Sequence, residues 1–219
     1  NALGIAEYQT LDNHDGELMP SLQVRHQVIR AIRKWNADIV LGLRPNDYHP
    51  DHRNAGKVVV DASYMVIVPN VCPDTPPLSK NPLFLYMEDR FDKPYPHQPD
   101  VVVAIDEAIE LKIDGLHAHT SQMYEWLPWT RGGDANVATI PTSDKKRREW
   151  LSKRVKKRSS IGDLLEPNDM NSKKRASLIK WYGKDYANKV KYIESFEVAE
   201  YGMQPTDQDL RKFFPMLKK

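Results

Sequence analysis

The segment Asp47–His52, with the sequence Asp-Tyr-His-Pro-Asp-His, holds the residue types best suited to chemistry in this chain. His49 and His52 are three positions apart, and Pro50 suits the first position of a helix, where its missing N–H would be unpaired anyway. Two neutral imidazoles near a carboxylate can hold a zinc-type ion or act as acid and base, and Asp51 can accept a ring N–H. The spacing alone also fits the commoner case, a capped helix start with surface histidines.

The elements around this segment predict where it lies. Residues 21–35 have apolar side chains at helical spacing after Ser21, a candidate N-cap, and residues 39–43 form a short apolar run typical of a strand buried on both faces. Helical spacing resumes after the segment, which places His52 in a first helical turn. Ligands bind beyond the carboxyl ends of strands in open α/β sheets, so we expect both histidines to face that crevice.

Further strands and helices alternate along the chain, which predicts α/β layering with a mainly parallel sheet. Asp106 is a good N-cap for the helix that follows it. Trp126 and Trp129, with Pro128 between them, fit either a hydrophobic rim for an acyl or sugar group or simply core. The other predicted elements are strands at 83–87, 101–105 and 193–201, a helix at 109–127, a helix with a basic face at 145–158 and a helix at 172–191.

The composition is that of an ordinary soluble globular protein, since 40% of the 219 residues are hydrophobic and 32 Lys and Arg face 30 Asp and Glu. This balance predicts no nucleic-acid partner, and no apolar run approaches the roughly 20 residues of a transmembrane segment. The single cysteine, Cys72, excludes an internal disulfide and a Cys-only zinc site. We expect one domain over 1–219, with 143–219 a basic helical region that closes on a strand. The oligomeric state and the compartment stay open, with the cytoplasm favoured.

Four segments, in this order and spacing, resemble the signatures of one family. They are Leu11-Asp12 with Asp15-Gly16-Glu17-Leu18, similar to its D-G-x-L segment; residues 37–53; Lys112 with His119-Thr120-Ser121-Gln122, similar to K-x6-H-x-S-Q; and residues 194–202, similar to E-x-F-x-x-x-E-Y. The family is the PIG-L/LmbE-like group of zinc-dependent de-N-acetylases, which includes enzymes acting on N-acetylglucosaminyl-phosphatidylinositol and on related bacterial glycosides. The resemblance implies a Rossmann-like three-layer α/β fold and a small N-acetylated sugar or glycoside as substrate.

The same resemblance implies roles for single residues. It makes His52 a ligand of one zinc ion, which polarises the amide carbonyl and lowers the pKa of a bound water. It makes His49 the group that stabilises the oxyanion and is a candidate to protonate the leaving amine, with Asp51 orienting it.

Three further residues are candidate substrate contacts, each with a structural alternative. Asp15 either approaches sugar hydroxyls or belongs to a simple turn. Asp47 either reaches the outer shell of the metal or, as we favour, bonds loop amides. His119 either lines the site or packs beside an apolar helix stripe.

The chain departs from the family pattern in one respect. It contains no A-H-P-D-D motif, which in the family supplies a zinc-binding His, a zinc-binding Asp and a general base. We expect the first βα unit of the fold, with these groups, upstream of Asn1. The alternative function is a non-catalytic sugar- or phosphate-binding domain on the same scaffold.

Overall fold

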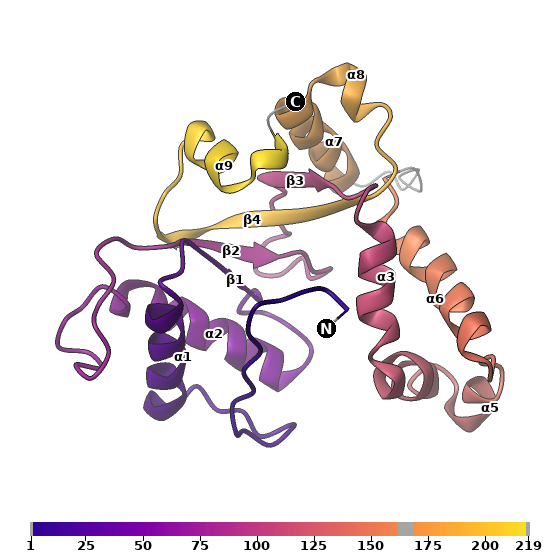
Figure 1. Ribbon diagram of the computed structural model, residues 1–219, viewed down its shortest axis with the longest axis horizontal. Helices are drawn as coiled ribbons and strands as arrows, with labels where there is room; N and C mark the ends of the chain where they lie inside the picture. Colours follow the sequence, from indigo (N-terminus) through magenta and orange to yellow (C-terminus); the bar gives the residue numbers. More distant parts are fainter. Residues whose placement is uncertain (1, 162–168, 218–219) are drawn as a thin grey trace. The chain divides into compact units, whose positions relative to one another are not determined.

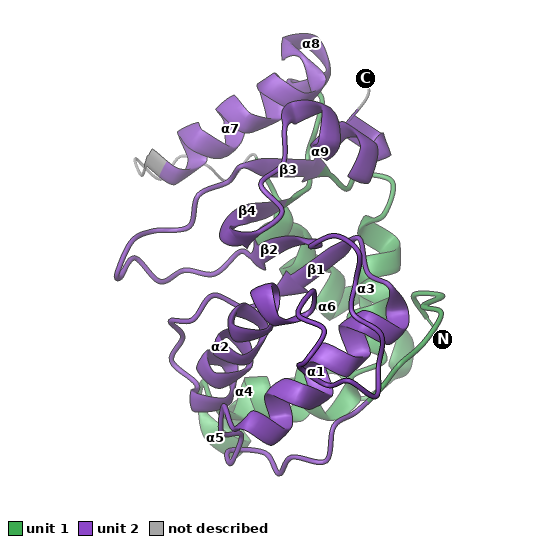
Figure 2. Ribbon diagram, turned by 90° about the vertical axis from the view of Figure 1, so that its left-hand side faces the viewer, with its two compact units in different colours: residues 1–9, 104–167, 189–194 green, residues 10–103, 168–188, 195–219 purple. Residues whose placement is uncertain are grey.

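The computed structural model describes residues 2–161 and 169–217. Its contacts divide the chain into two compact units, shown in Figure 2. Unit 1 comprises Asn1–Gln9, Ala104–Pro167 and Lys189–Glu194, and unit 2 comprises Thr10–Val103, Asn168–Asn188 and Ser195–Lys219. The single domain over 1–219 that the sequence predicted remains a prediction.

The four predicted strands are present and form one sheet in the order β1-β2-β4-β3 (Figure 1). β1 pairs with β2 in parallel and β2 pairs with β4 in antiparallel, so the α/β class is confirmed with a mixed sheet. The strands are β1 (Ile39–Gly42), β2 (Leu83–Met87), β3 (Val101–Ala104) and β4 (Ile193–Gly202).

β1 is less buried than its apolar sequence predicts. It stands at one end of the strand order, and its Leu41 side chain is 48% exposed. Leu41 pairs in register with Leu85 of β2, which is buried. The burial on both faces that the sequence predicted is therefore wrong for β1, because the face that carries Leu41 is open to solvent there, whereas the same face is buried at Leu85 of β2.

Two helices, α1 (Leu22–Trp35) and α2 (Pro50–Met65), pack against each other and against one face of the sheet (Figure 1). Ser21 caps α1 as predicted, its Oγ accepting the N–H of Val24. The hydrophobic core between these helices and the sheet includes Ile29, Ile32, Ala62, Val66, Phe84, Tyr86 and Ala199.

Gly56 allows α2 to lie directly on the backbone that follows β1. A Cβ at this position would be 2.6 Å from the carbonyl oxygen of Leu43 and 2.9 Å from that of Arg44. A larger residue would push the helix away, so glycine fixes the start of α2 against the end of β1.

Arg33 fixes the other end of α2. Its side chain is buried, and its guanidinium donates to the backbone carbonyls of Met65, Val66, Val68, Val71, Cys72 and Thr75 at 2.6 to 3.1 Å. The helix end and the loop after it thus have their carbonyl oxygens bound by one cation.

Unit 2 also contains α7 (Asp169–Tyr182), α8 (Lys184–Ala187), α9 (Asp207–Phe213) and the 3₁₀ helix η2 (Pro215–Leu217). The helix predicted over 172–191 is divided between α7 and α8, because Gly183 takes a left-handed φ of 77°. Trp181 and Ser177 donate to the carbonyl oxygen of Asp100, which docks α7 beside the start of β3.

Unit 1 is helical, and its longest helices, α3 (Ile109–His117) and α6 (Asp144–Ser159), run side by side (Figure 1). Between them lie a π-helix, η1 (Gln122–Trp126), and the short helices α4 (Leu127–Trp129) and α5 (Gly133–Val137). The helix predicted over 109–127 is therefore split.

Asp106 does not cap α3, which corrects the prediction from the sequence. The N-cap of α3 is Ala108, and the Asp106 carboxylate accepts the backbone N–H groups of Lys191 and Tyr192. A carboxylate can accept any backbone N–H that lies close in space, and here those N–H groups belong to residues far away in the sequence. Within the described ranges, no helix is both long and apolar enough to cross a membrane.

Candidate active site

His49 and His52 lie together at the start of α2, as the sequence predicted. Their ring centroids are 4.9 Å apart. His49 is the N-cap, Pro50 is the first helical residue, and His52 is in the first turn. The turn after β1 therefore holds two imidazoles at one edge of the sheet.

The hydrogen bonds of His49 fix which ring nitrogen carries its proton. Its Nδ1 accepts the backbone N–H of Asp51 at 3.2 Å. A nitrogen that accepts has no proton in neutral imidazole, so the proton of His49 is on Nε2. His49 can therefore donate a hydrogen bond from Nε2.

His52 has the opposite arrangement. Its Nδ1 lies 3.1 Å from Oδ1 of Asp47, a carboxylate oxygen that can only accept. The proton of His52 is thus on Nδ1, and Nε2 presents a lone pair, as in histidines that bind metals with a carboxylate behind them. The same Oδ1 of Asp47 accepts the backbone N–H of His49 at 2.9 Å. Asp47 thus bonds a loop amide, the role favoured from the sequence, and a histidine ring as well.

Asp51 holds a loop and not the ring of His49. Its carboxylate accepts the backbone N–H of Gly16 at 2.7 Å and that of Leu18 at 3.1 Å. Asn54 adds a bond from its side chain to the carbonyl oxygen of Leu18. Asp51 contacts the ring of His49 through its backbone N–H, so its carboxylate does not orient that ring.

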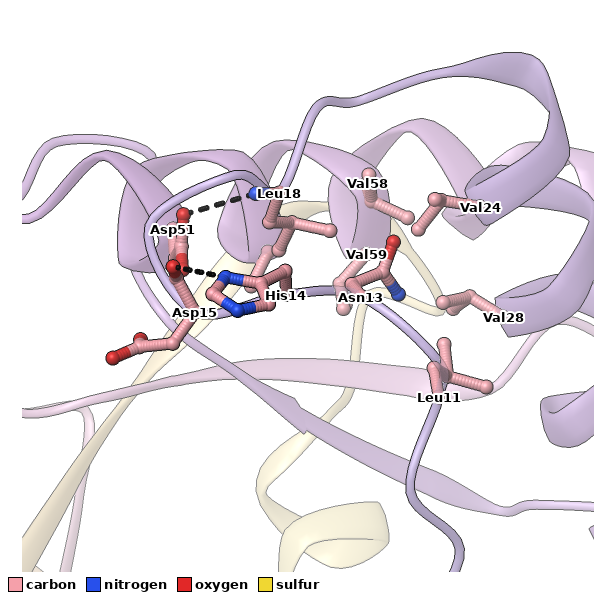
Figure 3. A pocket seen from close by; sticks show the side chains of 11 residues that line it. Leu11, Asn13, His14, Asp15, Leu18, Val24, Val28, Asp51, Val58 and Val59 are labelled. Carbon is pink, nitrogen blue, oxygen red and sulfur yellow. Dashed lines mark hydrogen bonds between the residues drawn. The ribbon is translucent and has the colours of Figure 1, made fainter.

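This loop covers a pocket of about 340 Å³ between α1 and α2 (Figure 3). Its floor is apolar and its rim is polar, with Asp15 and His14 beside Asp51. The lining residues are Leu11, Asn13, His14, Asp15, Leu18, Val24, Val28, Asp51, Ala55, Val58 and Val59. Asp15 therefore lies at the edge of a cavity, while its role as a sugar contact stays a prediction.

His119 lies in unit 1, just after α3, and its side chain is exposed. It is not packed into an apolar stripe, so the structural alternative is wrong for this residue. Of the same motif, Lys112 forms an ion pair with Glu194, which begins the closing segment of the resemblance. Two of the four segments thus meet in unit 1.

Arg44, which follows β1, was missed by the sequence analysis. It is buried and donates to the carboxylate of Asp89 at 2.8 Å, to the carbonyl oxygen of Phe91 at 3.0 Å and to that of Tyr95. Its Nε lies 3.7 Å from a carboxylate oxygen of Glu197. Arg44 therefore fastens the loop after β2 to the turn that carries the histidines.

The same loop also contacts the histidine turn at the surface. Asn46 donates to the carbonyl oxygen of Lys93, and the ring of Tyr48 lies 6.4 Å from that of Phe91. Tyr48 is edge-on to both imidazoles, with centroid distances of 5.9 and 5.7 Å. The loop therefore forms part of the surroundings of both histidine rings.

A second polar cluster, buried at His97 and Ser195, lies at the same end of the strands. Nε2 of His97 is 3.0 Å from the hydroxyl of Ser195, which donates to Glu88, and Glu88 also pairs with Lys174. Burial lowers the pKa of His97 to about 4, and burial also raises the pKa of Glu197, whose carboxylate lies 3.5 Å from Nδ1 of His97. These shifts keep His97 neutral at physiological pH.

The chemistry of the donors allows one test of a metal site. Nε2 of His52 has the lone pair and the carboxylate support that a metal ligand needs. No group of three His, Cys, Asp or Glu side chains in the described ranges is arranged to hold a metal ion. These residues therefore offer a ligand at His52 and do not form a complete site.

Comparisons with known proteins bear on this arrangement. The family model for PIG-L, GlcNAc-PI de-N-acetylase, matches residues 1–63. Diacetylchitobiose deacetylase of Thermococcus kodakarensis is 30% identical over 137 residues, which cover 59% of this chain and 50% of that protein. The chain thus spans about half the length of this curated relative.

A solved structure shares the fold. It is N,N'-diacetylchitobiose deacetylase from Pyrococcus horikoshii complexed with its inhibitor MPG, with a TM-score of 0.55 and 20% identity. The match covers 90% of this chain and 59% of that one. The resemblance to PIG-L/LmbE-like de-N-acetylases that the four segments indicated is therefore confirmed, and the fold that this chain shares with that structure is Rossmann-like α/β.

Proposed function

We propose that this chain removes the N-acetyl group from an N-acetylglucosamine-type glycoside or a related small acetamide. The observation that carries the proposal is the pair of histidines with opposite tautomers, since His49 offers an Nε2–H donor beside the Nε2 lone pair of His52. The match to diacetylchitobiose deacetylase supports the choice of substrate.

Amide hydrolysis needs a donor where the carbonyl oxygen becomes negative. With the acetamide carbonyl near Nε2 of His49, the N–H stabilises the oxygen of the tetrahedral intermediate. The departing amine is a poor leaving group unless protonated, and its proton would come from the attacking water by way of a general base, because neutral His49 would be left as an imidazolate if it gave up its Nε2 proton. The bond from the Asp51 backbone N–H keeps the lone pair on Nδ1 and holds the ring so that Nε2–H can donate to the oxyanion.

We also propose that the reaction depends on zinc, with His52 as one ligand. A bound zinc ion would polarise the carbonyl and lower the pKa of a water molecule. Its other ligands would come from outside the residues that the structure describes. Asp47 orients the ring of His52 through the bond to Nδ1, so that Nε2 of His52 would bind the zinc ion.

The test is acetate release from N,N'-diacetylchitobiose by the chain, the His49→Ala variant and the His52→Ala variant. We expect His49→Ala to lower kcat at least 100-fold, in the range typical of a lost oxyanion donor, with metal content unchanged. The matched control is His26→Ala, which removes a histidine of α1 in the same unit. Sugar binding without acetate release by the unaltered chain would contradict the proposal and favour a binding domain.

A further inference from the structure

Two tryptophans stand exposed on one helical segment of unit 1. Trp126 is 54% exposed and Trp129 is 49% exposed, although indole is among the most apolar side chains. Their rings are nearly parallel, with 16° between the planes and 5.5 Å between the centroids. They are thus a surface pair, and the alternative that they are core is wrong.

The segment that carries the pair is firmly anchored. Tyr124, two residues before Trp126, is buried, and its hydroxyl lies 2.6 Å from Nδ1 of His117. On the other side, the side chain of Asn136 donates to the carbonyl oxygen of Pro128 at 2.6 Å. Because both flanks are tied down, the exposed indoles do not need a partner protein to be held in position.

The backbone between the anchors is a π-helix, a rare form that occurs often at functional sites. The N–H of Leu127 bonds to the carbonyl oxygen of Gln122, five residues earlier. Tyr124 is buried in the core while Trp126, two residues later, is at the surface.

The neighbours of the pair in the sequence are polar, and their two charges are opposite. Gln122 and Glu125 precede the tryptophans by one turn, and Thr130 and Arg131 follow them, all four exposed. The opposite charges of Glu125 and Arg131 give no net attraction for a polyanion. These polar neighbours differ from the apolar surface that is expected at the centre of a protein interface.

We propose that Trp126 and Trp129 form a carbohydrate-binding platform on which a pyranose ring of a neutral oligosaccharide stacks. One face of a pyranose ring carries C–H groups, which fit the electron-rich face of an indole. The hydroxyl groups at the ring edge need planar donors and acceptors, which the neighbouring amide, carboxylate and guanidinium can supply. This combination distinguishes a sugar from a purely apolar or purely anionic ligand.

The proposal adds a binding site to the proposed function. We choose a chitin-type sugar as the probe because of the proposed function. The stacking of a pyranose ring on the two indoles does not depend on that function.

The experiment is calorimetric titration of the full chain with the β-1,4-linked pentasaccharide of N-acetylglucosamine. It uses the His49→Ala background, in which the sugar is not consumed. We expect Trp126→Ala with Trp129→Ala to weaken binding about tenfold or more, as for loss of one or two aromatic stacking contacts. The matched control is Trp35→Ala, which removes an isolated tryptophan, 59% exposed, from α1.

Two results would overturn the platform: no binding of the pentasaccharide at millimolar concentration, or equal binding by the double variant. Circular dichroism and thermal melting check that the double variant folds, and Trp126→Phe with Trp129→Phe should keep most of the affinity. Acetate release from the disaccharide is measured separately with an intact His49. Binding without release contradicts the proposed function alone, and release without platform binding contradicts this inference alone.

Discussion

Replacing Asp51 by Ala tests whether its carboxylate holds the loop that covers the pocket. The change removes the acceptor of two backbone N–H groups, those of Gly16 and Leu18. A hydrogen bond to a charged group contributes about 1.5 kcal/mol at the low end of the usual range. Each amide should therefore open more easily by about that amount, which makes its hydrogen exchange about tenfold faster.

The assay is amide hydrogen exchange followed by NMR or mass spectrometry. We expect faster exchange at residues 14–18 and little change in the rest of α2. Asp51→Asn, which keeps one acceptor oxygen, should give about half the effect. Asp106→Ala is a matched control, because it also removes a carboxylate that accepts two backbone N–H groups, at Lys191 and Tyr192.

The kinetic effect of the same variant separates two roles. If the Asp51 carboxylate anchors the loop, its removal should displace Asp15, raise KM and leave kcat within a few-fold of the wild-type value. If the carboxylate orients the ring of His49, its removal should lower kcat. Unchanged exchange at Gly16 and Leu18 in Asp51→Ala would refute the anchor. A fall in kcat with normal exchange would favour the role that the family resemblance implied.

Four other outcomes follow from the structure. His52→Ala should lower the zinc content of the purified chain, measured by elemental analysis, and an unchanged content would exclude it as a ligand. Arg33→Lys should lower the free energy of unfolding by about 3 kcal/mol in urea, because a single ammonium cannot reach six carbonyl oxygens; a loss below 1 kcal/mol would contradict this. Gly56→Ala should also destabilise, by about 1 to 3 kcal/mol in the same assay, and wild-type stability would refute the close approach. Burial lowers the pKa of His97 to about 4, below its usual 6.5, so stability should be complete above pH 6.5 and fall as the pH drops toward 4. His97→Gln should flatten that acid limb, and an identical pH profile of unfolding would show that another group causes it.

The strands, the main helices and the histidine turn could be predicted because their signals are local. The apolar runs gave the four strands, and Ser21 and Pro50 marked the starts of α1 and α2. His49 and His52 followed from these elements, since the turn after a strand and the first turn of a helix have few possible geometries. Their tautomers could not be predicted, because they depend on the hydrogen-bond partners of Nδ1.

The remaining features depend on residues far apart in the sequence. Asp106 looked like a helix cap, and its amide partners come from the chain before β4. Arg44 gave no local signal, because its partners are in the loop after β2 and, at Glu197, in β4. The exposure of Trp126 and Trp129 gave no local signal, because apolar side chains at helical spacing fit a core as well as a surface.

Asp47 couples the position of the His49 backbone to the position of the His52 ring. A single oxygen, Oδ1, accepts both the backbone N–H of His49 and the ring of His52. An Asn at this position keeps an oxygen in the same place, so Asp47→Asn removes the charge behind the ring while the geometry is preserved. A Glu moves that oxygen by one methylene and shifts the helix start and the imidazole together. The charge at this position can therefore be tuned alone, whereas the ring of His52 cannot be repositioned without rebuilding the start of α2.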